Sequence, residues 1–301
     1  MASAGEELNS FEIEFCGRAI EITHPSNVKI DKESLESWTA FKNWKTTLEE
    51  NFALQETKQD HAFHDDPYML QSIKIMSVYW HGTRIFFMKV KPNITGSKLD
   101  PETGKAKDLS AVTLLRGGSV AMLMVLRPMD SQDEKLVVMT EQPRVSAGSL
   151  RFWEIPAGML NDEHDFVLAA AREIEEDTGF DIPSSELVDM TELALRNSEL
   201  PESNMKSAMY LSPGGCDEYV ALVLWEKKVD RFEIEELKCR MTGQRKEGGI
   251  MTLRLVDYEV LWREGARDAK TLAAWALYEG LSKAGILQEE IHKRKQARNV
   301  N

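Results

Sequence analysis

Three acidic residues that lie close together in the chain are the first feature able to do chemistry. Glu173, Glu176 and Asp177 are spaced so that, in an α-helix, their carboxylates would share one face. Like charges at this spacing cost roughly 0.2–0.5 kcal/mol per pair, and acids near a helix C-terminus oppose its dipole. Because Mg²⁺ and other hard divalent cations prefer oxygen ligands, the cluster indicates a metal site. On spacing alone, a solvated acidic face explains it equally well.

A helix over residues 165–178 would position these carboxylates. Asp165 can cap its N-terminus, and Gly179 can supply the left-handed residue that ends it. Apolar residues at helical spacing predict a buried stripe on the neighbouring face, formed by Val167, Ala170, Ala171 and Ile174.

Residues 158–180, GMLNDEHDFVLAAAREIEEDTGF, resemble the Nudix box. The matching positions are Gly158, Arg172, Glu173, Ile174, Glu176, Gly179 and Phe180. The resemblance implies structural or orienting roles for Gly158, Arg172 and Gly179, with Arg172 orienting a metal-binding carboxylate through a charge-assisted hydrogen bond. Two positions depart from the pattern. His164 replaces a glutamate that supports the loop and helix end in the family, and Asp177 replaces a glutamate that usually binds metal.

Upstream of the box, the segment TEQPRVSAGSLRFWEIPAGML extends the resemblance, which covers residues 70–285. It is to the ADP-ribose pyrophosphatase and ADP-sugar diphosphatase branch, particularly the plant type. The metal ligands that it implies are Glu154, the Ala157 carbonyl, Glu173, Glu176 and Asp177. Arg144 would bind a phosphate or a ribose. The alternatives are an ordinary surface cation at Arg144 and an ordinary strand residue at Glu154.

Other candidate residues lie in two loops and one strand. The segment YLSPGGCDEY resembles the loop that marks ADP-sugar specificity, which implies that Glu218 contacts nucleoside or sugar hydroxyls. Glu247 lies in the loop where relatives carry a catalytic glutamate, although the usual position aligns with Gly249. Tyr79 and Trp80 are candidates for stacking on adenine near a dimer contact, or are core strand residues.

The expected function is Mg²⁺-dependent hydrolysis of the diphosphate of ADP-ribose or ADP-glucose to AMP and a sugar phosphate, with Mn²⁺ as a second usable ion. The expected catalytic residues are Glu173, Glu176, Asp177 and Glu247. A homodimer is expected from the same resemblance. Two alternatives stay open: a Nudix pyrophosphatase for another nucleotide diphosphate, such as NADH or coenzyme A, and a catalytically weak protein that binds nucleotide sugars.

The elements that must position these residues predict a mixed α/β sandwich, and the resemblance implies that this α/β fold is a Nudix α/β/α sandwich with a mixed sheet. A smaller β-containing N-terminal region, residues 1–108, would precede the Nudix domain at residues 109–301. In the N-terminal region we expect an amphipathic helix that packs through Trp38, Phe41, Trp44 and Leu48, and a hairpin over residues 69–90. A polar stretch over residues 93–108 is the expected boundary with the main domain. Later strands are expected at 119–128, 135–142, 219–229 and 250–258, and a helix at 268–283.

Composition limits the class of protein. The 301-residue chain has a net charge of −13, which disfavours nonspecific binding to nucleic acid or to anionic membranes. Its three cysteines have no metal-site spacing and suit a reducing compartment. Since the first residues lack the features of a signal or transit peptide, the expected location is the cytoplasm.

Overall fold

The computed structural model describes residues 7–160, 171–172, 175, 180, 182–198, 204–239 and 251–300. The chain forms two compact units. The N-terminal unit comprises Met1–Gly118, Leu200–Lys206 and Ser212–Glu218, and the second unit comprises Ser119–Glu199, Ser207–Leu211 and Tyr219–Asn301. The N-terminal unit therefore includes more than the predicted segment 1–108, and it contains part of the loop that precedes Tyr219.

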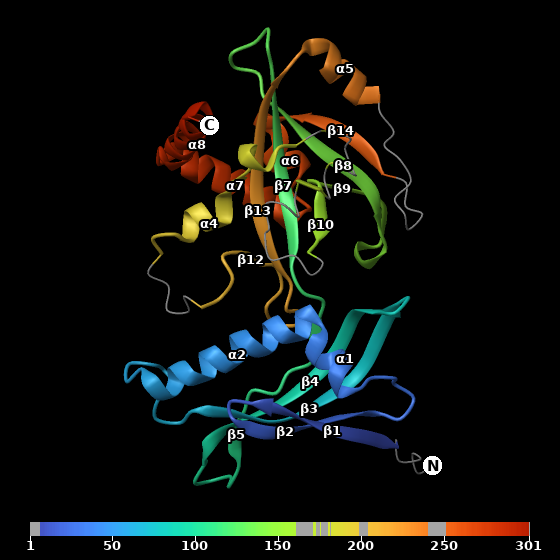
Figure 1. Ribbon diagram of the computed structural model, residues 1–301, viewed down its shortest axis with the longest axis vertical. Helices are drawn as coiled ribbons and strands as arrows, with labels where there is room; N and C mark the ends of the chain where they lie inside the picture. Colours follow the sequence, from blue (N-terminus) through green and yellow to red (C-terminus); the bar gives the residue numbers. More distant parts are fainter. Residues whose placement is uncertain are drawn as a thin grey trace. The chain divides into compact units, whose positions relative to one another are not determined.

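The N-terminal unit is built on one sheet (Figure 1). Its strands are β1 (Leu8–Phe15), β2 (Arg18–Pro25), β3 (Tyr68–His81), β4 (Arg84–Leu99) and β5 (Ala106–Asp108), with β6 (Thr113–Leu115) paired to β4. The β2–β3 pair is parallel and the other pairs are antiparallel. The predicted hairpin is confirmed as β3–β4, whereas β1 and β2 were not predicted.

Two helices of this unit are α1 (Lys32–Ser37) and α2 (Thr39–Thr57). The apolar stripe predicted for the first helix packs on the core that β1 to β4 and β6 form: Phe41 is fully buried there, while Trp38, Trp44 and Leu48 are partly buried. The stripe is therefore packing, as predicted.

The first part of the polar segment after the predicted hairpin belongs to a strand. Asn93–Leu99 continues β4, and its partners are on β3 and β5. Pro92, Ile94 and Gly96 are buried and alternate with the exposed Lys91 and Asn93, so the segment has the period of a half-buried strand. The polar composition hid this alternation, so the continuation of the strand beyond Val90 was not predicted.

The second unit contains a mixed sheet whose main strands run in the order β11–β13–β7–β8–β14. These strands are β7 (Ser119–Pro128), β8 (Leu136–Arg144), β11 (Val188–Asp189), β13 (Tyr219–Val229) and β14 (Thr252–Asp257). Short strands β9 (Ser149–Glu154), β10 (Ala157–Met159) and β12 (Met209–Tyr210) pair with β8, β7 and β13. β13 and β7 are parallel, and the other pairs are antiparallel.

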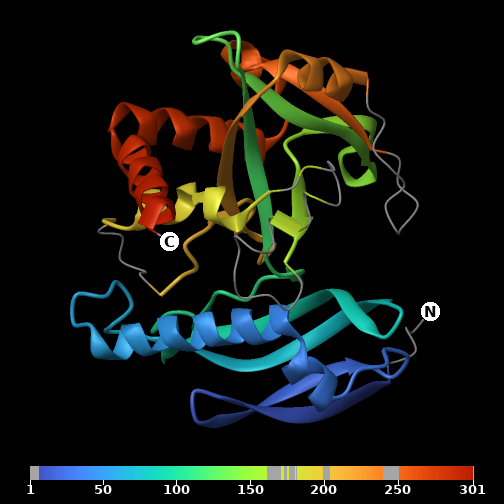
Figure 2. The ribbon, with the colours of Figure 1, turned by 45° about the horizontal axis from the view of Figure 1, so that its top comes forward.

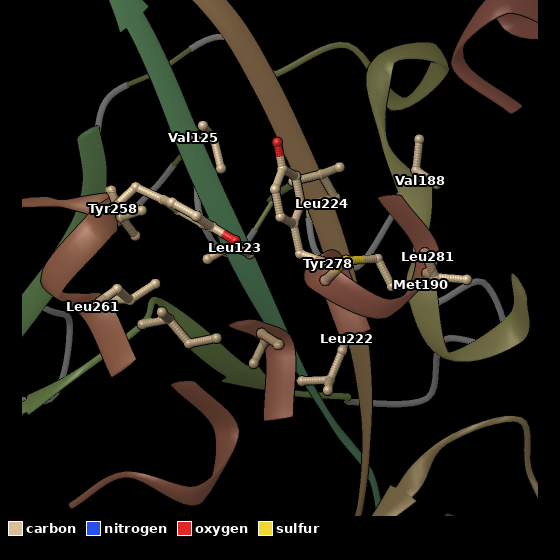
Figure 3. Close-up of a cluster of buried hydrophobic side chains, with 14 of the residues drawn as sticks. Leu123, Val125, Val188, Met190, Leu222, Leu224, Tyr258, Leu261, Tyr278 and Leu281 are labelled. Carbon is tan, nitrogen blue, oxygen red and sulfur yellow. The ribbon is translucent and has the colours of Figure 1, made fainter. Parts of the chain in front are cut away.

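Both faces of this sheet are covered. Along β7, Leu123 and Val125 belong to one buried cluster and Met122 and Met124 to the other. The first cluster includes side chains of α4 (Met190–Leu195), α7 (Ala269–Lys283) and α8 (Ile286–Val300), and the second includes side chains of α5 (Arg231–Cys239). Figure 2 shows α7 and α8 in red beside β13 and β7, and Figure 3 shows the first cluster. The predicted α/β sandwich is confirmed.

The remaining short elements are η1 (Val145–Ala147), η2 (Ser184–Glu186), η3 (Tyr258–Val260) and α6 (Leu261–Glu264). Within the described part of the chain, no helix combines the length and the apolar character needed to cross a bilayer.

The turn from α6 into α7 is closely packed. A Cβ atom added at Gly265 would lie 2.3 Å from the Thr271 Cγ2 atom and 3.1 Å from the Leu261 carbonyl oxygen. The Thr271 hydroxyl also donates to the Asp268 carboxylate (2.7 Å), which caps α7. This turn therefore requires glycine to place the start of α7.

A second anchor fastens the segment Ser212–Glu218 within the N-terminal unit. The Asp217 carboxylate accepts hydrogen bonds from the backbone N–H groups of Arg116 (2.7 Å) and Gly117 (3.1 Å). Burial raises the pKa of Asp217 to about 6 in spite of these donors. Gly117 has a φ of +81°, and a Cβ there would lie 3.1 Å from the Ala40 Cβ, so glycine allows the turn that presents both N–H groups.

Gly265→Ala should destabilise the protein by about 1–3 kcal/mol, because the added methyl group forces Thr271 or the backbone to move. Gly280→Ala, inside α7, is the matched control: its Cβ would meet nothing within 4 Å, so alanine should be neutral or stabilise by about 0.5–1 kcal/mol. Denaturant unfolding measures both. Equal effects of the two substitutions would contradict the packing of this turn.

Asp217→Asn should change the pH dependence of stability. The folded-state pKa of Asp217 is above the ordinary value of 3.8, so this group stabilises the fold below pH 4, and the contribution is lost as the pH rises through about 6. Asparagine keeps a hydrogen-bond acceptor and does not titrate. Relative to wild type, the variant should gain roughly 1–3 kcal/mol between pH 4 and pH 7, measured by urea unfolding. Asp133→Asn, at an exposed acid, is the control and should show no such gain.

Candidate active site

The Glu154 carboxylate is a buried acidic group of the second unit. Glu154 ends β9 and is only 2% exposed. It lies opposite Thr140 of β8, whose hydroxyl donates to the Glu154 carbonyl (3.2 Å). The strand pairing therefore holds the backbone of Glu154 and leaves its carboxylate to be satisfied by other elements.

Two cations bind this carboxylate. The Arg144 Nε atom, at the end of β8, donates to Oε1 (2.6 Å), and the Lys270 Nζ atom, in the first turn of α7, donates to Oε2 (3.0 Å). Lys270 Nζ also donates to Asp268 Oδ1 (2.7 Å). A buried carboxylate would strongly destabilise the fold if it were unpaired, so these cations supply the partners that burial of Glu154 requires.

The start of α7 is fixed against the residue that follows Glu154. Asp268 caps the helix by accepting from the backbone N–H of Thr271 (3.1 Å). The Thr271 hydroxyl accepts from the backbone N–H of Ile155 (3.1 Å). Burial lowers the pKa of Lys270, but the carboxylates of Asp268 and Glu154 outweigh burial and raise it. Lys270 therefore stays a cation between two carboxylates.

Lys270 and Asp268 are site residues that the sequence interpretation missed. Asp268 precedes a helix and has the type of an N-cap residue, which predicts its capping role but not its contact with Lys270. A lysine in the first turn of a helix has no local signal that points to a partner 116 residues away.

Ala157 and Gly158 lie on β10, whose antiparallel partner is β7. Ala157 is opposite Ala121, and Gly158 is buried opposite Val120. The backbone N–H of Met122 donates to the Pro156 carbonyl (2.9 Å). The backbone that carries the predicted Ala157 metal ligand is thus held by the sheet. Its role as a ligand stays a prediction.

Most of the predicted metal ligands lie outside the described residues, namely Glu173, Glu176 and Asp177, as do Gly179, Glu247 and His164. Arg172 is described and exposed, and its neighbour Ala171 is buried in the core, as the predicted stripe requires. Across the residues that the structure describes, no group of three His, Cys, Asp or Glu side chains could hold a metal. The donors that are described, the Glu154 carboxylate and the Ala157 carbonyl, are hard oxygens of the kind that suits Mg²⁺.

The other predicted contacts belong to the N-terminal unit. Glu218 forms an ion pair with Arg116 (3.2 Å), and the Arg116 guanidinium lies 5.8 Å from the centroid of the Phe87 ring. Tyr79 stacks on Phe87 with an angle of 24° between the rings, and it is 60% exposed. Trp80, beside it on β3, is partly buried. The fold therefore joins Glu218 to the aromatic hairpin through Arg116 and Phe87, and ligand contacts of Glu218, Tyr79 and Trp80 stay predictions.

Comparison with known proteins places this geometry in a family. A model described as the NUDIX domain matches residues 118–275. Over 251 residues the chain is 34% identical to "Nudix hydrolase 14, chloroplastic" of Arabidopsis thaliana. The aligned region covers 83% of this chain and 73% of that protein. A solved structure, "Crystal structure of ADP compounds hydrolase", is similar with 15% identity and a TM-score of 0.41, covering 72% of this chain and 98% of that chain. Since the family match spans more than half of the chain and includes Glu154 and the predicted box, the protein belongs to the Nudix hydrolases, which act on diphosphates.

Proposed function

We propose that this Nudix hydrolase cleaves the diphosphate of a nucleoside-diphosphate sugar, ADP-ribose or ADP-glucose, to AMP and a sugar phosphate. The observation that carries the proposal is the buried Glu154 carboxylate between Arg144 and Lys270, inside the region that the family match covers. The sugar substrate is supported by the resemblance of YLSPGGCDEY to a specificity loop. It is also supported by the ion pair of Glu218 with Arg116, since the Arg116 guanidinium lies over Phe87, the ring on which the exposed Tyr79 stacks.

Each group has a separate task in this reaction. Glu173, Glu176 and Asp177, with Glu154 and the Ala157 carbonyl, would hold Mg²⁺ or Mn²⁺, which would supply positive charge against the diphosphate. Arg144, whose side chain is 38% exposed, would bind a phosphate oxygen. Glu247 would accept the proton of the attacking water. A bond from the water oxygen to phosphorus forms, and the bond from phosphorus to the bridging oxygen breaks.

The substrate assignment predicts a specific pattern of products. Incubation with Mg²⁺ and ADP-ribose, ADP-glucose, NADH, coenzyme A or GDP-mannose should yield AMP and sugar phosphate fastest from one of the two ADP-sugars. In Glu176→Gln, turnover should fall by about a hundredfold or more, since the amide keeps the shape but removes a charge that binds the ion. Chromatography of the nucleotide products measures both.

The same panel separates the alternatives. Preference for NADH or coenzyme A would assign a different diphosphate substrate. Tight binding of ADP-ribose with negligible turnover would indicate a nucleotide-sugar-binding protein, in line with the departures at His164 and Asp177. Full activity in a folded Glu176→Gln protein would remove Glu176 from the metal site.

Glu218→Ala should raise KM about tenfold and leave kcat within about threefold, because its proposed partner is a nucleoside or sugar hydroxyl away from the reacting phosphorus. Steady-state kinetics on the preferred ADP-sugar gives both constants. Glu192→Ala, at a solvent-facing acid of α4, is the control and should change neither. A collapse of kcat at unchanged KM would assign Glu218 to the chemical step instead.

A further inference from the structure

The two cations on Glu154 are held differently. The Lys270 side chain is 14% exposed and bridges two buried carboxylates, those of Glu154 and Asp268. The Arg144 side chain is 38% exposed, and it ends β8 next to the exposed Val145 of η1. Lys270 is therefore the more enclosed partner of the Glu154 carboxylate and is shared with a second carboxylate, whereas Arg144 is the more exposed partner.

The Lys270 side chain is not needed to cap α7, the helix in which it lies. Asp268 already caps α7 through the backbone N–H and hydroxyl of Thr271. A positive charge in the first turn of a helix opposes the helix dipole, and a buried ion pair contributes little net stability compared with apolar residues of similar size. Helix stability alone therefore does not explain a buried lysine at this position, whereas the Glu154 carboxylate does.

Both oxygens of Glu154 already accept a cation's hydrogen bond. Arg144, Lys270, Glu154 and Asp268 together carry two positive and two negative charges, so the cluster is neutral before any metal binds. A divalent cation that approached Glu154 would be repelled by the buried ammonium, because like charges in a partly desolvated place interact more strongly than in water. Lys270 thus competes with the divalent ion for one carboxylate.

We infer that Lys270 is a positioning residue of the active site, which holds the Glu154 carboxylate from the start of α7 and limits the affinity of that carboxylate for the divalent cation. The inference rests on the proposed function in one respect: it requires a divalent cation at Glu154.

The test measures metal binding without substrate. Mn²⁺ is titrated into wild type, Lys270→Met, Lys270→Arg and Lys283→Met, and free Mn²⁺ is followed by electron paramagnetic resonance. Lys270→Met should bind Mn²⁺ about tenfold more tightly, because a competing charge is removed. Lys270→Arg keeps the charge and should stay within about twofold of wild type. Lys283→Met removes an exposed lysine from the same helix and should have no effect.

Two further measurements assign the effect to Glu154. In a Glu154→Gln background, Lys270→Met should no longer change Mn²⁺ affinity. Saturating Mn²⁺ should also raise the melting temperature of Lys270→Met more than that of wild type, since the ion then replaces the missing partner of a buried carboxylate. If Lys270→Met does not fold, Lys270→Gln, which keeps an N–H donor, replaces it in both measurements.

The outcomes separate this inference from the proposed function. If wild type binds Mn²⁺ and hydrolyses ADP-sugars, but Lys270→Met binds Mn²⁺ no more tightly, the inference is overturned and the proposed function stands. The same holds if the tightening persists in the Glu154→Gln background. If wild type binds no Mn²⁺, both the inference and the metal-dependent function are overturned.

Discussion

The burial of one carboxylate, that of Glu154, is the constraint on which the neighbouring elements of the second unit depend. An ionised carboxylate removed from water needs partners of opposite charge. They come from separate elements, with Arg144 at the end of β8 and Lys270 at the start of α7. The bond from Ile155 to Thr271 ties the same helix start to the strand that carries Glu154. β9 and α7 must therefore pack in the correct register for the Glu154 carboxylate to be paired.

The sheet explains why these polar groups gather at the ends of elements. β7 and β13 are covered on both faces, so the residues along their middle are apolar and buried. The middle of such a strand offers no place for a charge. Arg144 and Glu154 end β8 and β9, and Lys270 lies in the first turn of α7. The apolar middle of the sheet is thus bordered by polar residues, whose charges are paired at the ends of strands and helices.

The N-terminal unit fixes the conformation of a loop that is distant in sequence, Ser212–Glu218. Asp217 accepts the backbone N–H groups of Arg116 and Gly117, while the Arg116 side chain joins Glu218 to Phe87. The Asp217 carboxylate therefore fixes the loop to the backbone at Arg116 and Gly117. The Arg116 guanidinium, which lies over the Phe87 ring, fixes the Glu218 side chain. A loop fixed in this way has little conformational entropy left to lose when a ligand binds.

The sequence by itself determined the features that repeat locally. The apolar runs of β7 and β13, the packing stripe through Phe41 and the spacing of the Nudix box are all readable from neighbouring residues, because helix and strand periods place nearby side chains on known faces. Polar composition misled only where alternation was faint, as at Asn93–Leu99. The tertiary structure alone decided that Lys270 meets Glu154 and that Asp217 meets Arg116, pairs separated by 116 and 101 positions. Periodicity reports which face of an element a residue occupies, whereas the partner across that face depends on how whole elements pack.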